Sequence, residues 1–252
     1  MNSFISSDDV LLTERFLRDG YIIQRAEQQL SLNLLREIVA PFEPSDSAAL
    51  NDLKLEVMAR LNTHPTTRRA YYNLAKELLH SLIGNELAMQ KKFNVNIQMP
   101  QDAKSLLPVH ADTWTGDSPY QLVLWVPLTD CYRTKSMYIL PPGEPYSLEG
   151  SSEDVWERIK GRVQFLDVKY GEVLLFNPTL PHGNRVNEES STRWTINCRF
   201  KSVWSPYAVK GAGEHFEPIT LRAASRIGMA YKHPEITKRY EIEAKDVSGY
   251  IT

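Results

Sequence analysis

Two histidines and one aspartate stand where they can share a metal ion. His110 lies two residues before Asp112 in a segment expected to be extended, and His182 follows a later expected strand. Alternate residues of an extended segment point to the same side, so His110 and Asp112 can reach one ion. Two imidazoles and a carboxylate suit Fe(II) and leave coordination positions open for reactants. The pair alone is weak evidence, because a turn histidine beside a solvated aspartate is a common alternative.

Arg193 strengthens the hypothesis of a metal site. It follows His182 by eleven residues and stands at the start of the next expected strand. Its planar guanidinium can hold a carboxylate through two parallel hydrogen bonds. Thr195 lies two residues further on, faces the same way and can add a hydroxyl group. A surface salt bridge is the alternative role for Arg193.

Further candidates are polar or aromatic residues close to these positions. Asn96 and Gln98 share the polar face of the expected strand 92–99. Polar side chains that face the interior need hydrogen-bond partners, and a ligand bound in a pocket could supply them. The alternative is a strand face that is exposed to solvent. Trp114 stands beside the candidate ligands and can stack on a ring of a bound molecule; a lid anchor or a core position are its alternatives.

The elements that must position these residues follow from periodicity and turn signals. Apolar periodicity with caps predicts helices over 8–19, 28–40, 50–61, 67–83 and 219–230. Strands are expected over 21–24, 92–99, 122–128, 136–140, 163–168, 172–176 and 193–203. Six strands within the middle of the chain, split by glycine and proline turns without helices between them, favour an antiparallel barrel or jelly roll. The loops 113–120 and 141–162 are expected at the mouth of the pocket.

The predicted fold class is therefore mainly β with flanking helices, a double-stranded β-helix (jelly roll) with a helical N-terminal part. We expect one domain over residues 1–252, since the length fits one large domain. Its parts are a helical segment 1–88, a jelly-roll core 89–205 and a C-terminal extension 206–252. The extension carries Leu221, Ile227 and Met229, which either form a homodimer contact or pack on the barrel.

Composition excludes several classes of protein. The 252 residues hold 29 Lys and Arg against 31 Asp and Glu, a net charge of −2, so a nucleic-acid partner is not expected. No apolar run approaches the roughly 20 residues that span a bilayer, and the first residues lack the pattern of a secretory signal. We therefore expect a cytoplasmic protein without membrane insertion. Cys131 and Cys198 are expected to be reduced buried thiols, with a disulfide as the alternative.

These residues resemble those of a known family. The chain is similar to the phytanoyl-CoA dioxygenase-like branch of the 2-oxoglutarate/Fe(II)-dependent oxygenases, and most of all to bacterial oxygenases of surface-carbohydrate biosynthesis clusters. The resemblance covers roughly residues 8–205. The family motif His-x-Asp…His matches His110, Asp112 and His182, and its co-substrate arginine matches Arg193.

The resemblance to the family also includes a tryptophan, and this sequence departs from the family pattern at one segment. A tryptophan on the strand after the His-x-Asp segment matches Trp125, for which a core position is the alternative. A family stretch ending in Gly-Ser-His appears here as the segment 134–144, which keeps its proline and loses the Gly-Ser-His.

The resemblance implies an enzyme that uses Fe(II), 2-oxoglutarate and O2. His110, Asp112 and His182 would be the metal ligands, with Arg193, Thr195, Trp125, Gln98 and Asn96 binding the co-substrate and Trp114 the substrate. It implies hydroxylation of an aliphatic C–H, with release of succinate and CO2, on a small molecule such as a sugar or a glycan precursor. Because Asp112 is present, no ligand position is vacated for a halide, so hydroxylation is expected rather than halogenation.

Two rival hypotheses remain open. One is a metal-binding jelly-roll isomerase or binding protein that does not use 2-oxoglutarate; the spacing of Arg193 argues against it. The other is a catalytically silent interaction protein that binds no metal; the intact His110, Asp112 and His182 count against it.

Overall fold

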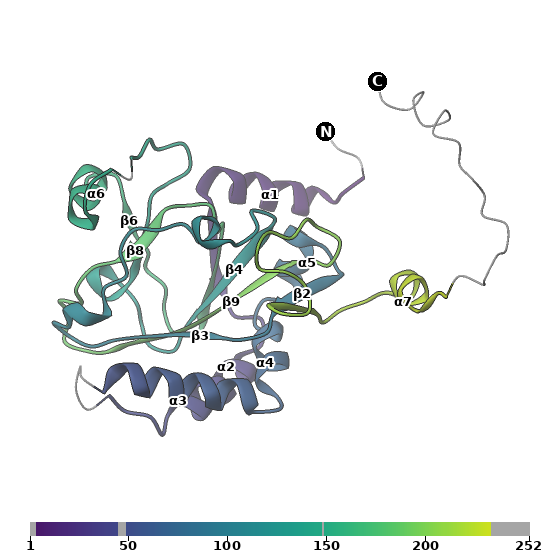
Figure 1. Ribbon diagram of the computed structural model, residues 1–252, viewed down its shortest axis with the longest axis horizontal. Coiled ribbons are helices and arrows are strands. Elements are labelled where there is room, and N and C mark those ends of the chain that lie inside the picture. Colours follow the sequence, from purple (N-terminus) through teal and green to yellow (C-terminus); the bar gives the residue numbers. More distant parts are fainter. Residues whose placement is uncertain (1–3, 45–48, 148, 233–252) are drawn as a thin grey trace. The chain divides into compact units, whose positions relative to one another are not determined.

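The computed structural model describes residues 4–44, 49–147 and 149–232 (Figure 1). These residues fall into two compact units, divided after Thr220. Helix α7 (Ala223–Ala230) belongs to the second unit, and none of its described side chains is buried. The predicted extension 206–252 reaches into residues 233–252, which lie outside the described residues. No helix in the described ranges has both the length and the apolar character needed to cross a membrane.

The first unit contains two antiparallel sheets. The larger has the strand order β1-β7-β4-β9-β2-β10, and β3 pairs with the first half of β9. The smaller has the order β6-β5-β8. The strands of the larger sheet are β1 (Tyr21–Arg25), β2 (Leu87–Gln90), β3 (Asn94–Gln98), β4 (Gln121–Pro127), β7 (Glu172–Phe176), β9 (Arg193–Ser202) and β10 (Phe216–Pro218). Those of the smaller are β5 (Met137–Ile139), β6 (Gln164–Phe165) and β8 (His182–Asn184).

Strand alternation decides what lies on each face of the larger sheet. On β4, Val123 and Trp125 belong to a core that also contains Met137 of the smaller sheet. Leu124 and Val126 point the other way and pack into the core shared with the N-terminal helices. Two sheets with a common core, covered by helices on one outer face, form a jelly roll. The predicted fold class is confirmed.

The N-terminal helices cover the outer face of the larger sheet (Figure 1). They are α1 (Ser7–Asp19), α2 (Gln29–Val39), α3 (Leu50–Thr63), α4 (Thr67–Asn73) and α5 (Lys76–Ile83). The boundaries of α1 follow local chemistry, since the Ser6 hydroxyl accepts from the Asp9 amide and Gly20 ends the helix in the left-handed region. Buried Tyr71 of α4 fastens this layer to the sheet, because its hydroxyl donates to the Leu124 carbonyl at 2.6 Å.

The prediction of one helix over 67–83 is wrong. The chain leaves helical geometry at Ala75 (φ −148°) and starts again as α5. The Glu27 carboxylate accepts from the amides of Glu77 and Leu78 at 3.0–3.1 Å, which satisfies free N–H groups of the first turn of α5. This partner lies 50 residues away in sequence. Local periodicity therefore could not reveal the break.

The segment 141–162 is also more ordered than predicted. It contains helix α6 (Ser152–Ile159), which begins with a reciprocal capping box between Ser151 and Asp154. The expected strand 163–168 is reduced to β6, although Leu166 and Val168 remain buried in the core between the sheets. The strands β2, β8 and β10 were not predicted, because each is too short for a period-two pattern to be recognised.

Candidate metal centre

The structure brings His110, Asp112 and His182 together at one end of the smaller sheet. His182 begins β8, and its backbone pairs with that of His110 through two hydrogen bonds of 2.8 and 2.9 Å. Asp112 begins a short 3₁₀ helix, Asp112–Thr115. One nitrogen of each imidazole and one carboxylate oxygen lie within 4.8 Å of one another. The strand pairing thus joins two segments that are far apart in sequence into one potential ligand set.

Backbone carbonyls select the tautomer of both histidines. Nδ1 of His110 lies 2.9 Å from the Pro108 carbonyl, and Nδ1 of His182 lies 2.8 Å from the Leu180 carbonyl. A carbonyl oxygen only accepts, so each Nδ1 carries the proton and donates it. Nε2 of each ring then keeps its lone pair for a metal, with the ring orientation fixed from behind.

Burial and charge set the protonation of the cluster. Burial lowers the pKa of His182 to about 4, and the nearby His110 acts in the same direction. Burial alone would raise the pKa of Asp112, but Arg199, together with His182 and His110, outweighs burial and holds that pKa below its ordinary value. At neutral pH the site therefore offers a neutral His182 and an ionised carboxylate, which is the state that divalent metal binding requires.

The depressed pKa of His182 makes the stability of the metal-free protein dependent on pH. Between pH 6.5 and about 4, the unfolded chain binds a proton at this residue that the folded protein does not. The free energy of unfolding should therefore fall as the pH drops through this window, by at most about 3 kcal/mol. Urea unfolding across this pH range checks it, with His182→Gln as the comparison. Equal pH dependence in the two proteins would contradict it.

Arg193 lies in the same cavity with unused hydrogen-bonding capacity. Its side chain is buried, and Nη2 donates to Oδ1 of Asn96 at 2.7 Å. Among the described residues, no acceptor is bonded to its buried Nε or Nη1. Burial lowers the pKa of Arg193 to about 10, so the guanidinium is still charged at neutral pH. A buried cation with two free donors calls for an anionic ligand.

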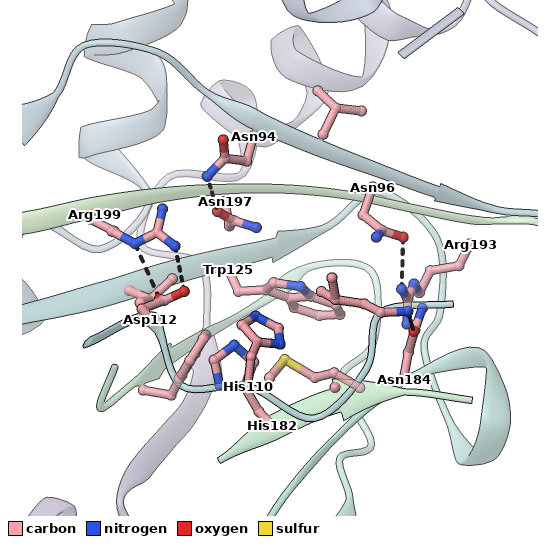
Figure 2. Close-up of a pocket in the computed structure, with 16 residues that line it drawn as sticks. Asn94, Asn96, His110, Asp112, Trp125, His182, Asn184, Arg193, Asn197 and Arg199 are labelled. Atoms are coloured by element: carbon pink, nitrogen blue, oxygen red, sulfur yellow. Dashed lines mark hydrogen bonds and ion pairs between the residues drawn. The ribbon is translucent and has the colours of Figure 1, made fainter. Parts of the chain in front are cut away.

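A cavity of about 240 Å³ connects these groups (Figure 2). In this view Asp112 and Arg199 lie toward one end and Arg193 toward the other, with Trp125 and the two histidines between them. Of the residues predicted from sequence, it is lined by His110, Asp112, Trp125, His182, Asn96 and Arg193. The polar face of β3 thus meets the cavity at Asn96 instead of bulk solvent.

Three predicted site residues are not among the described residues that line this cavity. Gln98 is buried and its amide donates to the Arg185 carbonyl. The Thr195 hydroxyl faces the Asn96 carbonyl at 3.5 Å. Trp114 is 39% exposed, with its ring 5.8 Å from that of Tyr146. Their assignment to co-substrate and substrate stays a prediction. Trp125 lies in the core and also lines the cavity, and its assignment to the co-substrate likewise stays a prediction.

Sequence reasoning missed Arg199, which also lines the cavity and binds Asp112 through two hydrogen bonds. It missed Asn94 and Asn197 too, whose amides are hydrogen-bonded across β3 and β9 at 3.0 Å. A signal was present, because alternate residues of β9 from Arg193 onward are all polar or charged. Such a row on a strand whose other face is apolar indicates a polar interior.

The donor set fits a metal ion of the Fe(II) type. It combines two imidazole nitrogens, whose tautomers leave Nε2 available, with one ionised carboxylate, and this is the composition of the facial triad of non-haem iron sites. The same cavity holds the free donors of Arg193. The residues present therefore suit a metal together with an anionic ligand.

The sequence matches no protein-family model, and no curated protein is significantly similar to it. Solved structures, however, resemble it in fold. The non-heme monooxygenase ThoJ in complex with nickel has a TM-score of 0.56 and 16% identity, over 85% of each chain. EctD from S. alaskensis with 2-oxoglutarate and 5-hydroxyectoine has a TM-score of 0.56 and 19% identity, over 82% of this chain and 80% of the other.

HygX from Streptomyces hygroscopicus, with nickel, 2-oxoglutarate and hygromycin B bound, gives a TM-score of 0.53 and 13% identity. The alignment covers 81% of this chain and 90% of HygX. At these identities the likeness concerns the fold. The helix-covered jelly roll of this chain is thus similar in fold to these three proteins.

Proposed function

We propose that this protein is an Fe(II)- and 2-oxoglutarate-dependent dioxygenase that hydroxylates an aliphatic C–H of a small molecule, with release of succinate and CO2. One observation carries the proposal. One cavity joins the cluster of His110, Asp112 and His182 to the unpartnered donors of Arg193. A metal and a carboxylate-bearing co-substrate are the two ligands that these groups suit. Neighbours in fold that hold nickel and 2-oxoglutarate support the proposal.

Each residue has a defined part in this function. His110, Asp112 and His182 would hold Fe(II), which supplies the activation of O2 coupled to oxidative decarboxylation of 2-oxoglutarate. Arg193 would take the distal carboxylate of 2-oxoglutarate through its free Nε–H and Nη1–H, while Asn96 holds the guanidinium in place from Nη2. Trp125 and the apolar wall of the cavity would exclude water from the reacting groups. Thr195 and Gln98 would support the co-substrate end.

The presence of Asp112 bears on the type of reaction. A carboxylate in the third ligand position leaves no vacated protein site for a halide ion. We therefore propose hydroxylation of the substrate carbon and not halogenation. A chlorinated product formed in the presence of chloride would contradict this part of the proposal.

The substrate is proposed to be a sugar or a glycan precursor, as in the phytanoyl-CoA dioxygenase-like enzymes of carbohydrate biosynthesis that the sequence resembles. The partly exposed Trp114, paired with Tyr146, supports this class, because an aromatic face can stack on a sugar ring. The amides of Asn94 and Asn197 on the cavity wall can hydrogen-bond substrate hydroxyls.

The whole chain is proposed to act as one oxygenase domain in the cytoplasm. The thiols Cys131 and Cys198 are buried and free, which suits a reducing compartment. A homodimer is proposed through α7, where Ile227 and Met229 are largely exposed.

An anaerobic titration tests the function. Purified metal-free protein is titrated with Fe(II) and then with 2-oxoglutarate, and its visible absorption is recorded. We expect a metal-to-ligand band that requires both components. Iron binding without the band would favour a metal-binding jelly-roll isomerase or binding protein that does not use 2-oxoglutarate. Absence of iron binding would favour the interaction protein.

A further inference from the structure

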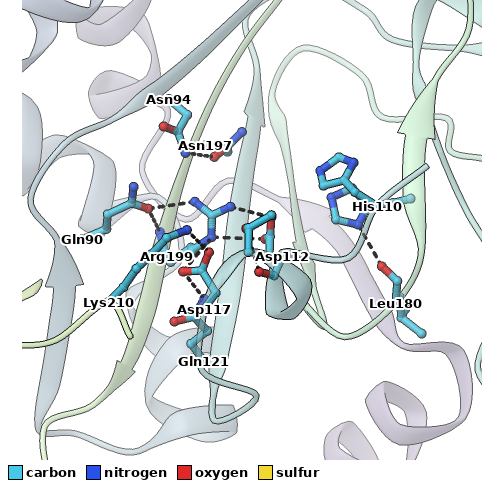
Figure 3. Close-up of polar contacts among 12 residues, drawn as sticks. Gln90, Asn94, His110, Asp112, Asp117, Gln121, Leu180, Asn197, Arg199 and Lys210 are labelled. Atoms are coloured by element: carbon cyan, nitrogen blue, oxygen red, sulfur yellow. Dashed lines mark hydrogen bonds and ion pairs between the residues drawn. The ribbon is translucent and has the colours of Figure 1, made fainter. Parts of the chain in front are cut away.

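Arg199 holds the Asp112 carboxylate by both of its oxygens (Figure 3). Its Nε donates to Oδ2 at 3.1 Å and its Nη2 donates to Oδ1 at 2.6 Å. This is the two-pronged arrangement in which a planar guanidinium meets a planar carboxylate edge on. The carboxylate edge that faces Arg199 is therefore already occupied.

Arg199 is itself fixed on its other sides. Nη1 donates to Oε1 of Gln90 at 3.1 Å, and the same oxygen accepts from the Arg199 backbone amide at 3.2 Å. Oδ1 of Asp117 lies 3.6 Å from Nε. Asp117 is in turn held by an ion pair with Lys210 and by a hydrogen bond of 2.9 Å from Gln121. With its side chain only 11% exposed, Arg199 has little freedom to turn away from Asp112.

The surrounding charges are balanced without any contribution from a metal. Arg199 and Lys210 carry two positive charges, and Asp112 and Asp117 carry two negative charges. The cluster is therefore neutral as long as position 199 carries a cation, and a lysine there would supply the same charge. The feature specific to Arg199 is the geometry of its contact with Asp112.

This geometry limits how Asp112 can bind a metal. A carboxylate that chelates an ion with both oxygens uses the two lone pairs on its open edge. In this protein the Nε–H and Nη2–H groups of Arg199 occupy those lone pairs of Asp112. A carboxylate that gives one oxygen to a metal can keep the other on the guanidinium. Chelation would use one more coordination position than binding through a single oxygen.

We propose that Arg199 is a positioning residue that restricts Asp112 to one-oxygen coordination and so keeps open the position that 2-oxoglutarate needs. The proposal rests on the proposed function, because it assigns Arg199 a role toward the iron and the co-substrate of that site. Nε and Nη2 of Arg199 act through Asp112 and do not touch the reacting atoms.

The test compares Arg199→Met and Arg199→Lys with the wild-type protein. Methionine removes both the charge and the paired N–H donors of the guanidinium. Lysine keeps the charge but cannot make the two parallel hydrogen bonds. Arg185→Met is the matched control, since Arg185 pairs with Glu153 at the surface and is absent from the residues that line the cavity. Anaerobic calorimetry measures the affinities for Fe(II) and then for 2-oxoglutarate, and circular dichroism monitors the fold.

We expect both Arg199 variants to bind Fe(II) at least as tightly as the wild type and to bind 2-oxoglutarate about 10- to 100-fold more weakly. Arg185→Met should match the wild type in both affinities. A folded Arg199→Met that binds 2-oxoglutarate normally would overturn the proposal. Wild-type behaviour of Arg199→Lys would also overturn it, because charge alone would then suffice. So would loss of Fe(II) binding in folded Arg199→Met, which would show that Arg199 supports the ligand set as a whole.

A measurement on the wild-type protein decides the case if the variants do not fold. The infrared difference between the iron-bound and the metal-free protein, with isotope-labelled aspartate, distinguishes the two binding modes by the splitting of the carboxylate stretches. The wide splitting of one-oxygen coordination is expected, and the narrow splitting of a chelate would overturn the proposal. Failure of the wild-type protein to bind Fe(II) or 2-oxoglutarate would instead contradict the proposed function, and this inference with it.

Discussion

Replacing His110 with alanine is expected to abolish Fe(II) binding. The change removes one of the three protein ligands and leaves only Asp112 and His182 for the ion. The backbone bridge between His110 and His182 remains, because it uses main-chain atoms only. The fold should therefore persist while the absorption band that needs iron and 2-oxoglutarate disappears. Anaerobic calorimetry and visible spectroscopy check both results.

His64→Ala is the matched control for this experiment. His64 caps the end of helix α3, and among the described residues its ring is hydrogen-bonded only to the hydroxyl of Thr66. This variant should bind Fe(II) like the wild type. Normal iron affinity in His110→Ala would show that the ion binds elsewhere, and the ligand assignment would be wrong.

Replacing Arg193 with methionine is expected to separate co-substrate binding from metal binding. Fe(II) affinity should stay near that of the wild type, because Arg193 is outside the proposed ligand set. The free energy of 2-oxoglutarate binding should become less favourable by about 2–4 kcal/mol, which is the cost of losing one member of a desolvated charge pair. Calorimetry with 2-oxoglutarate added to the iron-loaded protein measures this difference.

The same variant should not be less stable than the wild type. In the free protein Arg193 is a buried charge that lacks acceptors for Nε and Nη1, so methionine removes a desolvation cost. We expect an unfolding free energy equal to that of the wild type or above it. If the variant loses 2-oxoglutarate binding but keeps its stability, the role of Arg193 is to bind a ligand and not to stabilise the fold. Unchanged 2-oxoglutarate affinity would contradict the assignment, and Arg185→Met again serves as the control.

Much of the fold could be predicted because its signals are local. Gly20 and the hydroxyl of Ser6 mark the ends of α1, and the observed bounds of β7 agree with those expected from its flanking turn. The apolar and polar alternation of β9 placed Arg193 at its start. The break before α5 was missed because it depends on Glu27, and β8 was missed because a short strand forms only where its partners are present.

Part of the candidate site was predictable for a similar reason. His110 and Asp112 are two residues apart, and Arg193 follows His182 at a spacing that itself carried information. Arg199 has no such spacing to a recognised motif, and its meaning depends on the carboxylates it contacts. Asp112 and Asp117 reach Arg199 from a different segment of the chain, so their pairing was not visible in the sequence.

The sequence by itself determined the residue types that could bind a metal and a carboxylate, and the jelly roll that could carry them. It did so because periodicity, capping and short spacings act between neighbours along the chain. Only the tertiary structure decided which nitrogen of each histidine is available, and that Arg193 is buried with free donors. The tertiary structure also decided that Arg199 donates hydrogen bonds to both oxygens of the Asp112 carboxylate. Those properties arise from contacts between segments far apart in sequence, whose geometry and desolvation exist only in the folded protein.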